Sequence, residues 1–219
     1  MPRILCLHGF LGSPKDFSFL QDDYDYDCVI PDLNDYVSFD IHEIFSMLCK
    51  EYNLENDTIL LGYSFGSRLG AQLFSLYPER FSRIILLAGH LGLEDKLKDM
   101  RYKIELDFLD KITSLKATEF SRYWNGLKLF ENDKDQKLHI TDRAPDFFRN
   151  YGLSKQPSLA PLLLPHKERV SINYGELDFK YSQYAKEKLG EFSVNFIEGV
   201  GHRILQHPNI VRKIVRDFI

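Results

Sequence analysis

The sequence has few cysteines, no long apolar run and no excess of positive charge, and each shortage excludes a class of protein. Its three cysteines, Cys6, Cys28 and Cys49, are an odd number without the spacing of a metal site. We therefore interpret them as small buried hydrophobes in a reducing compartment. No apolar run reaches the length of a membrane span. The net charge of −4 argues against non-specific binding to nucleic acid, which needs a basic face.

Several familiar signals are also missing. The first residues run directly into a strand pattern, so we expect no signal peptide and a cytoplasmic location. No G-x-G-x-x-G, Walker, H-E-x-x-H or C-x-x-C motif occurs, and we therefore predict no metal or organic cofactor. The expected ligand is a small molecule, with the chain acting as a monomer or homodimer. Its 219 residues suffice for one domain, or for one domain with an inserted subdomain.

Short apolar runs alternate with segments of helical period along most of the chain. Six of the runs are predicted strands: 4–7, 28–30, 58–61, 84–87, 169–173 and 193–197. Apolar residues at consecutive positions suit strands that are covered on both faces, as in a parallel sheet. Helical patterns follow or separate them at 40–52, 65–76, 181–189 and 209–218. Strands that alternate with helices predict an α/β fold with a mostly parallel sheet.

The middle of the chain interrupts this alternation. Between residues 91 and 165 the sequence shows helical patterns at 94–112, 118–129 and 142–151 and no convincing strand. Such an insert predicts a helical cap over the carboxyl ends of the strands, where open α/β sheets bind ligands. We therefore predict a core of residues 1–90 and 166–219 and a cap of residues 91–165. The charged run 131–137 is expected to be a solvated loop.

The segment Gly62-Tyr63-Ser64-Phe65-Gly66 matches the G-x-S-x-G pattern of a nucleophile elbow. In such an elbow a sharp turn between a strand and a helix lifts the serine hydroxyl clear of the sheet. A predicted strand precedes the segment and a predicted helix follows it, as the motif requires. Both glycines stand where a side chain would collide with a neighbouring element. Ser64 is therefore the predicted reactive hydroxyl.

A reactive serine needs a base, and the base needs an acid that orients it. After an elbow of this kind the acid and the histidine follow in that order. Asp178 follows the fifth predicted strand and His202 the sixth, so both are expected at the sheet edge that holds Ser64. Glu176 is the alternative acid. His207 lies at the final predicted helix and is expected to face solvent.

Stabilising the negative charge of a transition state requires an oxyanion hole, usually two backbone N–H groups. The N–H of Phe65, directly after the serine, is one candidate. The other candidate is the N–H of Phe10, in a glycine-punctuated loop after the first predicted strand. His8, which opens this loop, is expected to hold the loop by a hydrogen bond.

These residues resemble the α/β-hydrolase superfamily and, within it, the MenH family of 2-succinyl-6-hydroxy-2,4-cyclohexadiene-1-carboxylate synthases. The likeness extends over most of the chain. It is carried by the loop 7–13, the elbow with Arg68 four residues after its serine, and the segments 77–81, 89–93, 120–130, 156–157 and 175–181. The resemblance implies an α/β-hydrolase fold of about six strands flanked by helices, with a helical cap insertion.

The resemblance also implies a lyase of menaquinone biosynthesis. The serine and its histidine would take a proton from carbon, and pyruvate would be eliminated from a succinyl-cyclohexene carboxylate. A substrate with several carboxylates needs guanidinium groups, which pair with carboxylates in a two-pronged fashion. Arg68 and Arg101 are the candidates for that role, and Tyr63 and Trp124 would line the pocket.

Other functions remain open on the sequence. The cap segment 100–103 has fewer arginines than the family's cap helix, and Arg143 and Arg149 are the nearby candidates for a further cation. A carboxylesterase or thioesterase would use the same triad covalently on a small substrate, and an apolar pocket would favour it. A binding protein on this scaffold would normally lack a member of the triad, and none is missing here.

Overall fold

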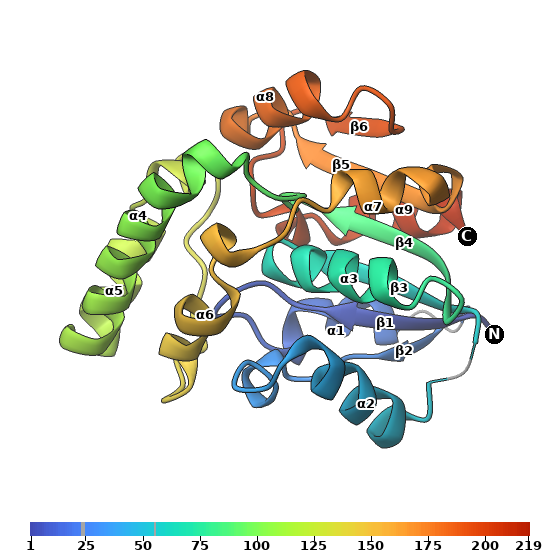
Figure 1. Cartoon of the computed structure of the whole chain (residues 1–219), viewed down its shortest axis with the longest axis horizontal. Coiled ribbons are helices and arrows are strands. Elements are labelled where there is room, and N and C mark those ends of the chain that lie inside the picture. Colours follow the sequence, from blue (N-terminus) through green and yellow to red (C-terminus); the bar gives the residue numbers. More distant parts are fainter. Residues whose placement is uncertain (23–24, 55) are drawn as a thin grey trace.

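The computed structural model describes residues 1–22, 25–54 and 56–219, and its strands form one sheet. The six strands are β1 (Arg3–Leu7), β2 (Asp27–Val29), β3 (Thr58–Tyr63), β4 (Phe81–Leu87), β5 (Val170–Gly175) and β6 (Val194–Ile197). Their order is β2-β1-β3-β4-β5-β6, and every neighbouring pair is parallel. The α/β fold with a parallel sheet is confirmed, and each strand lies within a few residues of its predicted range (Figure 1).

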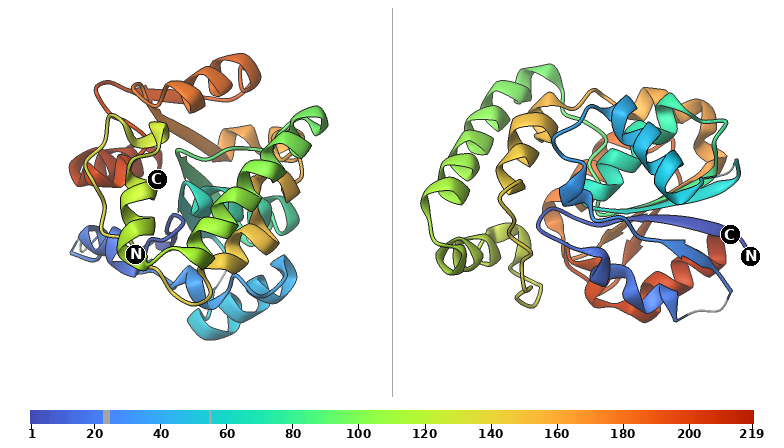
Figure 2. Two further views of the ribbon diagram at one scale, coloured as in Figure 1. Left: turned by 90° about the vertical axis from the view of Figure 1, so that its left-hand side faces the viewer. Right: turned by 90° about the horizontal axis from the view of Figure 1, so that it is seen from below.

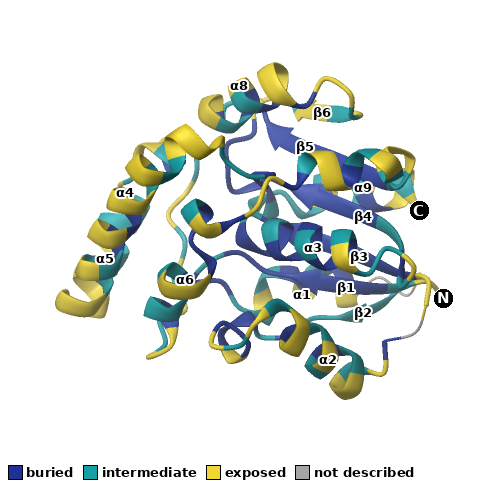
Figure 3. Cartoon of the chain, viewed as in Figure 1, coloured by how far each residue is buried: buried dark blue, intermediate teal, exposed yellow. Residues whose placement is uncertain are grey.

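Two layers of helices cover the sheet. One face carries α2 (Ile41–Tyr52), α3 (Phe65–Leu76), α7 (Ala160–Leu163) and α8 (Phe179–Lys188), and the other carries α1 (Ser18–Gln21) and α9 (Pro208–Phe218) (Figure 2). Successive residues of a strand point to opposite faces, so Leu5 joins one buried cluster and Ile4 the other. Because both faces are covered, the central strands are buried along their length (Figure 3).

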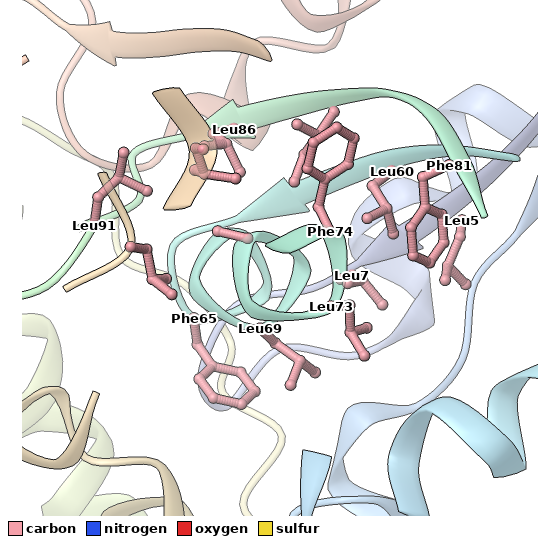
Figure 4. Packing of buried hydrophobic residues seen from close by; sticks show 14 of the residues in the cluster. Leu5, Leu7, Leu60, Phe65, Leu69, Leu73, Phe74, Phe81, Leu86 and Leu91 are labelled. Carbon is pink, nitrogen blue, oxygen red and sulfur yellow. The ribbon is translucent and has the colours of Figure 1, made fainter. Parts of the chain in front are cut away.

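Helix α3 is the element that places the predicted nucleophile. It follows β3 directly and packs across the neighbouring strands, with Leu73 and Phe74 buried against Leu5 and Leu60 (Figure 4). Full burial of each such side chain contributes about 1.5–3 kcal/mol to the stability of the fold. This packing fixes the helix on the sheet and therefore fixes the turn that precedes it.

Three helices stand beyond the carboxyl ends of the strands, and we call them the cap helices: α4 (Asp95–Ser114), α5 (Ala117–Asn125) and α6 (Ala144–Tyr151) (Figure 1). No strand occurs between residues 91 and 165, a stretch that is described throughout. The division into a core of 1–90 and 166–219 and a cap of 91–165 stays a prediction. Helix α7 lies inside the predicted cap range, yet its Leu163 packs in the buried cluster beside α3.

Short helical turns complete the chain. The 3-10 turns are Pro14–Phe17, Leu33–Asp35, Lys128–Phe130, Leu153–Lys155, Leu164–Arg169 and Ile204–Gln206. The sequence did not predict these turns or the four-residue helices α1 and α7, because so few residues carry no readable period. Among the described residues, no helix combines the length and the apolar character needed to cross a membrane.

Candidate active site

Ser64 lies on a strained turn between β3 and α3. Its backbone φ of 51° and ψ of −106° fall in a region that residues with side chains rarely occupy. A Cβ atom at Gly66 would lie 1.8 Å from the carbonyl oxygen of Leu7, and one at Gly62 would lie 2.5 Å from that of Gly66. Both positions therefore require glycine, as predicted. The Ser64 N–H donates to the carbonyl of Leu87 at 2.8 Å, which ties the turn to the neighbouring strand β4.

The three residues predicted to act together form one hydrogen-bonded chain. Ser64 Oγ lies 3.0 Å from His202 Nε2, and His202 Nδ1 lies 2.6 Å from Asp178 Oδ2. Asp178 follows β5 and caps α8, whereas His202 follows β6, so parallel strands bring all three to one sheet edge. The alternative acid, Glu176, is exposed. In this arrangement the imidazole can take the serine proton while Asp178 stabilises the resulting imidazolium.

Ser64 and Asp178, at the two ends of the hydrogen-bonded series, differ in their exposure to solvent. His202 and Asp178 are 1% and 2% exposed, so the hydrogen bond between them is shielded from water, whereas Ser64 is half-buried and opens to a cavity. Because no water competes for the hydrogen bond between His202 and Asp178, the two side chains are held in one geometry. The accessible hydroxyl therefore faces any ligand, and the pair behind it stays fixed.

The loop that carries Phe10 lies next to the elbow, since a Cβ atom at Gly9 would lie 3.7 Å from Ser64 Cβ. Phe10 and Phe65 both line the cavity that Ser64 opens to. The loop is held by His8: the N–H of Leu33 donates to its Nε2 at 2.8 Å, and its Nδ1 lies 2.8 Å from the carbonyl oxygen of Gly9. The predicted role of His8 in holding this loop is confirmed.

The cavity has a volume of about 610 Å³ and lies between the sheet edge and the cap helices. All four side chains predicted to contact substrate line it: Tyr63, Arg68, Arg101 and Trp124. Much of the remaining wall is aromatic. Lys180 and Lys128 also line it, and neither lysine was among the predicted site residues. The signal for Lys180 was its position two residues after Asp178, at the same sheet edge.

Arg68 extends from the first turn of α3 towards the cap. Its Nη1 donates to the carbonyl of Tyr151 at 3.0 Å and to Gln156 Oε1 at 3.2 Å. Burial lowers the pKa of the Arg68 guanidinium to about 10, which leaves it protonated at neutral pH. Both hydrogen bonds that it makes to described residues use Nη1. The edge formed by Nε and Nη2 can therefore meet a carboxylate.

Arg101 is held by a buried acid, Glu105, that was not predicted. Its Nε donates to Glu105 Oε1 at 2.7 Å, one helical turn along α4, and Glu105 is only 2% exposed. Glu105 also accepts hydrogen bonds from the N–H and hydroxyl of Ser154. The i, i+4 spacing of arginine and acid was the available signal. The other two candidate cations do not line the cavity: Arg143 pairs with Asp35 and Arg149 with Asp146 at the surface.

The segment 131–137 is a mostly exposed loop, as predicted, but Asp133 is half-buried and has specific partners. Its carboxylate accepts hydrogen bonds from the backbone N–H groups of His202 and Arg203, both at 3.1 Å. Arg203 is 2% exposed. An acid and its backbone partners separated by about 70 positions leave no local pattern in a sequence.

No group of three or more histidine, cysteine, aspartate or glutamate side chains is arranged as a metal site in the described parts of the chain. The cation side chains of the cavity could instead hold an anion.

Comparison with known proteins gives one consistent answer for the fold. Residues 2–152 match the family model described as alpha/beta hydrolase fold. A Bacillus subtilis protein that carries the provisional name 2-succinyl-6-hydroxy-2,4-cyclohexadiene-1-carboxylate synthase is 27% identical, with 99% of this chain and 89% of that protein covered.

Solved structures agree. The structure of MenH from S. aureus superposes with a TM-score of 0.83 at 20% identity, covering 99% of this chain and 92% of that chain. A carboxylesterase structure from the thaumarchaeon Nitrososphaera gargenis has a TM-score of 0.71 at 12% identity, covering 99% and 89%. At these identities the structures establish a shared fold, and the activity must be argued from the site.

Proposed function

The chain belongs to the α/β-hydrolase fold family of enzymes, and on that premise we propose that it is a MenH-type lyase with Ser64, His202 and Asp178 as its catalytic triad. The substrate would be a succinyl-cyclohexene carboxylate of menaquinone biosynthesis, from which pyruvate is eliminated. One observation carries the proposal: a single cavity is lined by the Ser64–His202 pair and by the guanidinium groups of Arg68 and Arg101. The resemblance to a relative named for this reaction supports it.

Each triad residue has a defined part in the elimination. His202 takes the hydroxyl proton of Ser64 at Nε2, and the Ser64 oxygen takes a proton from a substrate carbon. The electron pair of that C–H bond forms a new double bond in the ring product. At the same time the C–O bond breaks between the ring and the three-carbon group that leaves as pyruvate. Asp178 stabilises the imidazolium, and the proton is returned to the departing pyruvate. No bond forms between Ser64 and substrate, so no acyl-enzyme accumulates.

Charge that develops on the substrate needs donors in fixed positions. The backbone N–H groups of Phe10 and Phe65 are our candidates, because both residues line the cavity that Ser64 opens to. Backbone donors of this kind require no reorganisation during the reaction, which makes their stabilisation of a transition state large. Removing one such donor in a serine enzyme typically costs about 10²–10³ in turnover.

Arg68 and Arg101 would bind the substrate carboxylates. Arg68 and Phe65 both line the cavity, and the central carbon of the Arg68 guanidinium lies 5.3 Å from the centre of the Phe65 ring. Glu105 pairs with Arg101 and offsets part of the positive charge of the cavity. Lys180 adds a third cation beside the triad. A substrate with several carboxylates matches this distribution of positive charge better than a neutral ester does.

A second candidate function is a carboxylesterase or thioesterase that uses the same triad. The aromatic lining of the cavity, with Phe10, Trp124 and Phe147 in edge contacts of 4.6–4.9 Å between ring centres, favours it. In that reaction the Ser64 oxygen would attack a carbonyl carbon and form an acyl-enzyme, which water then hydrolyses. A neutral ester would leave Arg68 and Arg101 without a ligand, so we place this function second.

The deciding experiment measures pyruvate release from the menaquinone-pathway substrate, generated in situ, by the purified protein and its Ser64→Ala and His202→Ala variants. We expect rapid release by the wild type and a loss of about a thousandfold or more in each variant, because triad members act as a unit. Hydrolysis of a neutral aryl ester is measured beside it.

The two readouts separate the candidates. Near-normal pyruvate release by Ser64→Ala would refute the catalytic role of Ser64. No release by the wild type, together with Ser64-dependent cleavage of aryl esters, would refute the lyase and establish the hydrolase. A burst of product from the aryl ester, equal to the enzyme present, would reveal the acyl-enzyme that a hydrolase forms.

A further inference from the structure

We propose that Asp133 is a positioning residue that fixes the backbone of His202, so that the cap loop 131–137 takes part in aligning the base. The inference rests on the proposed catalytic role of His202 and holds for either the lyase or the hydrolase. It concerns a residue that does not line the cavity and touches the triad only through the backbone.

The Asp133 carboxylate bridges two successive N–H groups of the loop after β6. Oδ2 accepts from the His202 N–H at 3.1 Å and Oδ1 from the Arg203 N–H at 3.1 Å. The approach is close, since a Cβ atom at Gly201 would lie 2.4 Å from Asp133 Oδ1. A carboxylate that accepts two backbone donors holds that stretch of chain in one place, because charge-assisted bonds are the stronger ones.

His202 is consequently held at both ends. Asp178 fixes the ring through Nδ1 at 2.6 Å, and Asp133 fixes the backbone through N at 3.1 Å. Without the second bond, the ring could keep its contact with Asp178 while the residue shifts away from Ser64. A displacement of about 1 Å from reacting geometry can cost about a hundredfold in rate.

Arg203 anchors the same contact from the other side. Its buried guanidinium donates to Asn125 Oδ1 at 2.5 Å and to the carbonyl of Lys134 at 2.6 Å, and it stacks 4.0 Å from the centre of the Phe130 ring. These three partners lie on the end of α5 and the loop that follows it. The loop after β6, which we call the base loop because it carries His202, is therefore joined to the cap loop twice. Asp133 of the cap loop accepts from the backbone of the base loop, and the Arg203 side chain of the base loop donates to the cap loop.

The cap loop also reaches the strand end that carries the acid. Asn132 Nδ2 donates to the carbonyl of Leu177, the residue before Asp178, at 3.0 Å. Two neighbouring residues of one loop thus touch the chain at His202 and next to Asp178. A loop that served only to cover the cavity would need neither contact.

The test compares Asp133→Ala with a matched control, Gln206→Ala. Gln206 makes two hydrogen bonds to Lys134, one through its Nε2 and one through its Oε1, so the control removes as many bonds between the same two segments but none from His202. Asp135→Asn, which removes one negative charge from the same loop, controls for electrostatics. Steady-state turnover is measured with the best available substrate, and the rate of Ser64 modification is measured with a fluorophosphonate.

We expect Asp133→Ala to lower kcat and the modification rate by about 10- to 100-fold with little change in KM, because the base is displaced and the cavity is intact. Asp133→Asn, which keeps one acceptor oxygen, should lose less. Both controls should stay within about twofold of the wild type. The low-field proton NMR signal of His202 Nδ1–H should weaken in Asp133→Ala alone. The variants are compared at the same fraction of folded protein, where a general loss of stability does not weaken this signal.

Equal rates for Asp133→Ala and the wild type, with Ser64→Ala and His202→Ala inactive, would overturn the inference and leave the proposed triad standing. Equal losses in Asp133→Ala and Gln206→Ala would also overturn it, because the effect would then belong to loop anchoring in general. If Asp133→Ala does not fold, the same comparison is made with Asp133→Asn. Ser64→Ala that remained fully active would refute the triad itself, a result that Asp133 variants cannot mimic.

Discussion

Replacing Arg68 by alanine tests whether the cavity recognises carboxylates. Arg68 lines the cavity, and Tyr151 and Gln156 hold its Nη1, which leaves the Nε–Nη2 edge for a ligand. A substrate carboxylate on that edge would gain about 1.5–3 kcal/mol from charge-assisted hydrogen bonds. We therefore expect KM for a polycarboxylate substrate to rise about 10- to 150-fold in Arg68→Ala, at nearly constant kcat.

The same substitution has a structural cost that must be separated from recognition. It leaves the carbonyl of Tyr151 and the side-chain oxygen of Gln156 without their donor, which costs about 1–3 kcal/mol where these groups are buried. For a chain of this size each kcal/mol lowers Tm by about 2–4 °C. Gln156→Ala is the matched control, because it removes one of these contacts and keeps the cation.

The assay measures kcat and KM for the polycarboxylate and for a neutral aryl ester, at a temperature where every variant is folded. Arg68→Ala should change ester turnover by less than about threefold, and Arg68→Lys should recover only part of the carboxylate KM, since an ammonium cannot span two oxygens. Equal losses on both substrates would refute the reasoning. Arg68 would then support the fold and take no part in recognition.

Three further predictions follow from the geometry. Gly66→Ala should cost more than about 4 kcal/mol, seen as loss of folded protein, because its Cβ would lie 1.8 Å from the Leu7 oxygen. Gly70→Ala in the same helix, where the nearest atom is 3.4 Å away, should be neutral or stabilise by up to about 1 kcal/mol. Burial, with nearby cations, lowers the pKa of His90 to about 3, so only the unfolded chain gains a proton as pH falls below about 6.5. Urea unfolding should therefore show the wild type losing up to about 2 kcal/mol relative to His90→Gln between pH 6.5 and pH 5. The single tryptophan, Trp124, lines the cavity, so binding of a carboxylate ligand should change the intrinsic fluorescence, and Trp124→Phe should abolish that change.

The fold could be predicted because its signals are local. Strands buried on both faces form continuous apolar runs. The start of α2 is marked by its N-cap residue Asp40, whose carboxylate accepts from two backbone N–H groups of the first turn. The elbow was predictable for the same reason, since Gly62 and Gly66 satisfy steric needs at fixed offsets from Ser64. Asp178 and His202 could be found because parallel strands deliver residues after their ends to one edge.

Contacts between distant segments were not predictable. Asp133 and Glu105 lie in charged stretches that are typical of solvent-facing surface, and their partners are backbone N–H groups or a side chain whose burial depends on the tertiary structure. Arg203 follows the predicted base directly, yet nothing in the sequence indicates that it is among the largest fully buried side chains. A buried charge becomes recognisable only when its partners are known.

The positions of Arg68 and Arg203 imply that the cap helices order groups next to the proposed triad as well as enclosing the cavity. Arg68 joins the elbow helix to the end of α6 through Tyr151, and Arg203 joins the base loop to the end of α5 through Asn125. Each contact orders a group of the core that lies within a few residues of Ser64 or His202. Replacing the cap with that of another enzyme of this fold would therefore remove acceptors from the guanidinium groups of Arg68 and Arg203, beside the proposed triad. Such an exchange can alter specificity and preserve turnover only if the new cap supplies acceptors at both places, because an uncompensated buried charge costs about 3–5 kcal/mol.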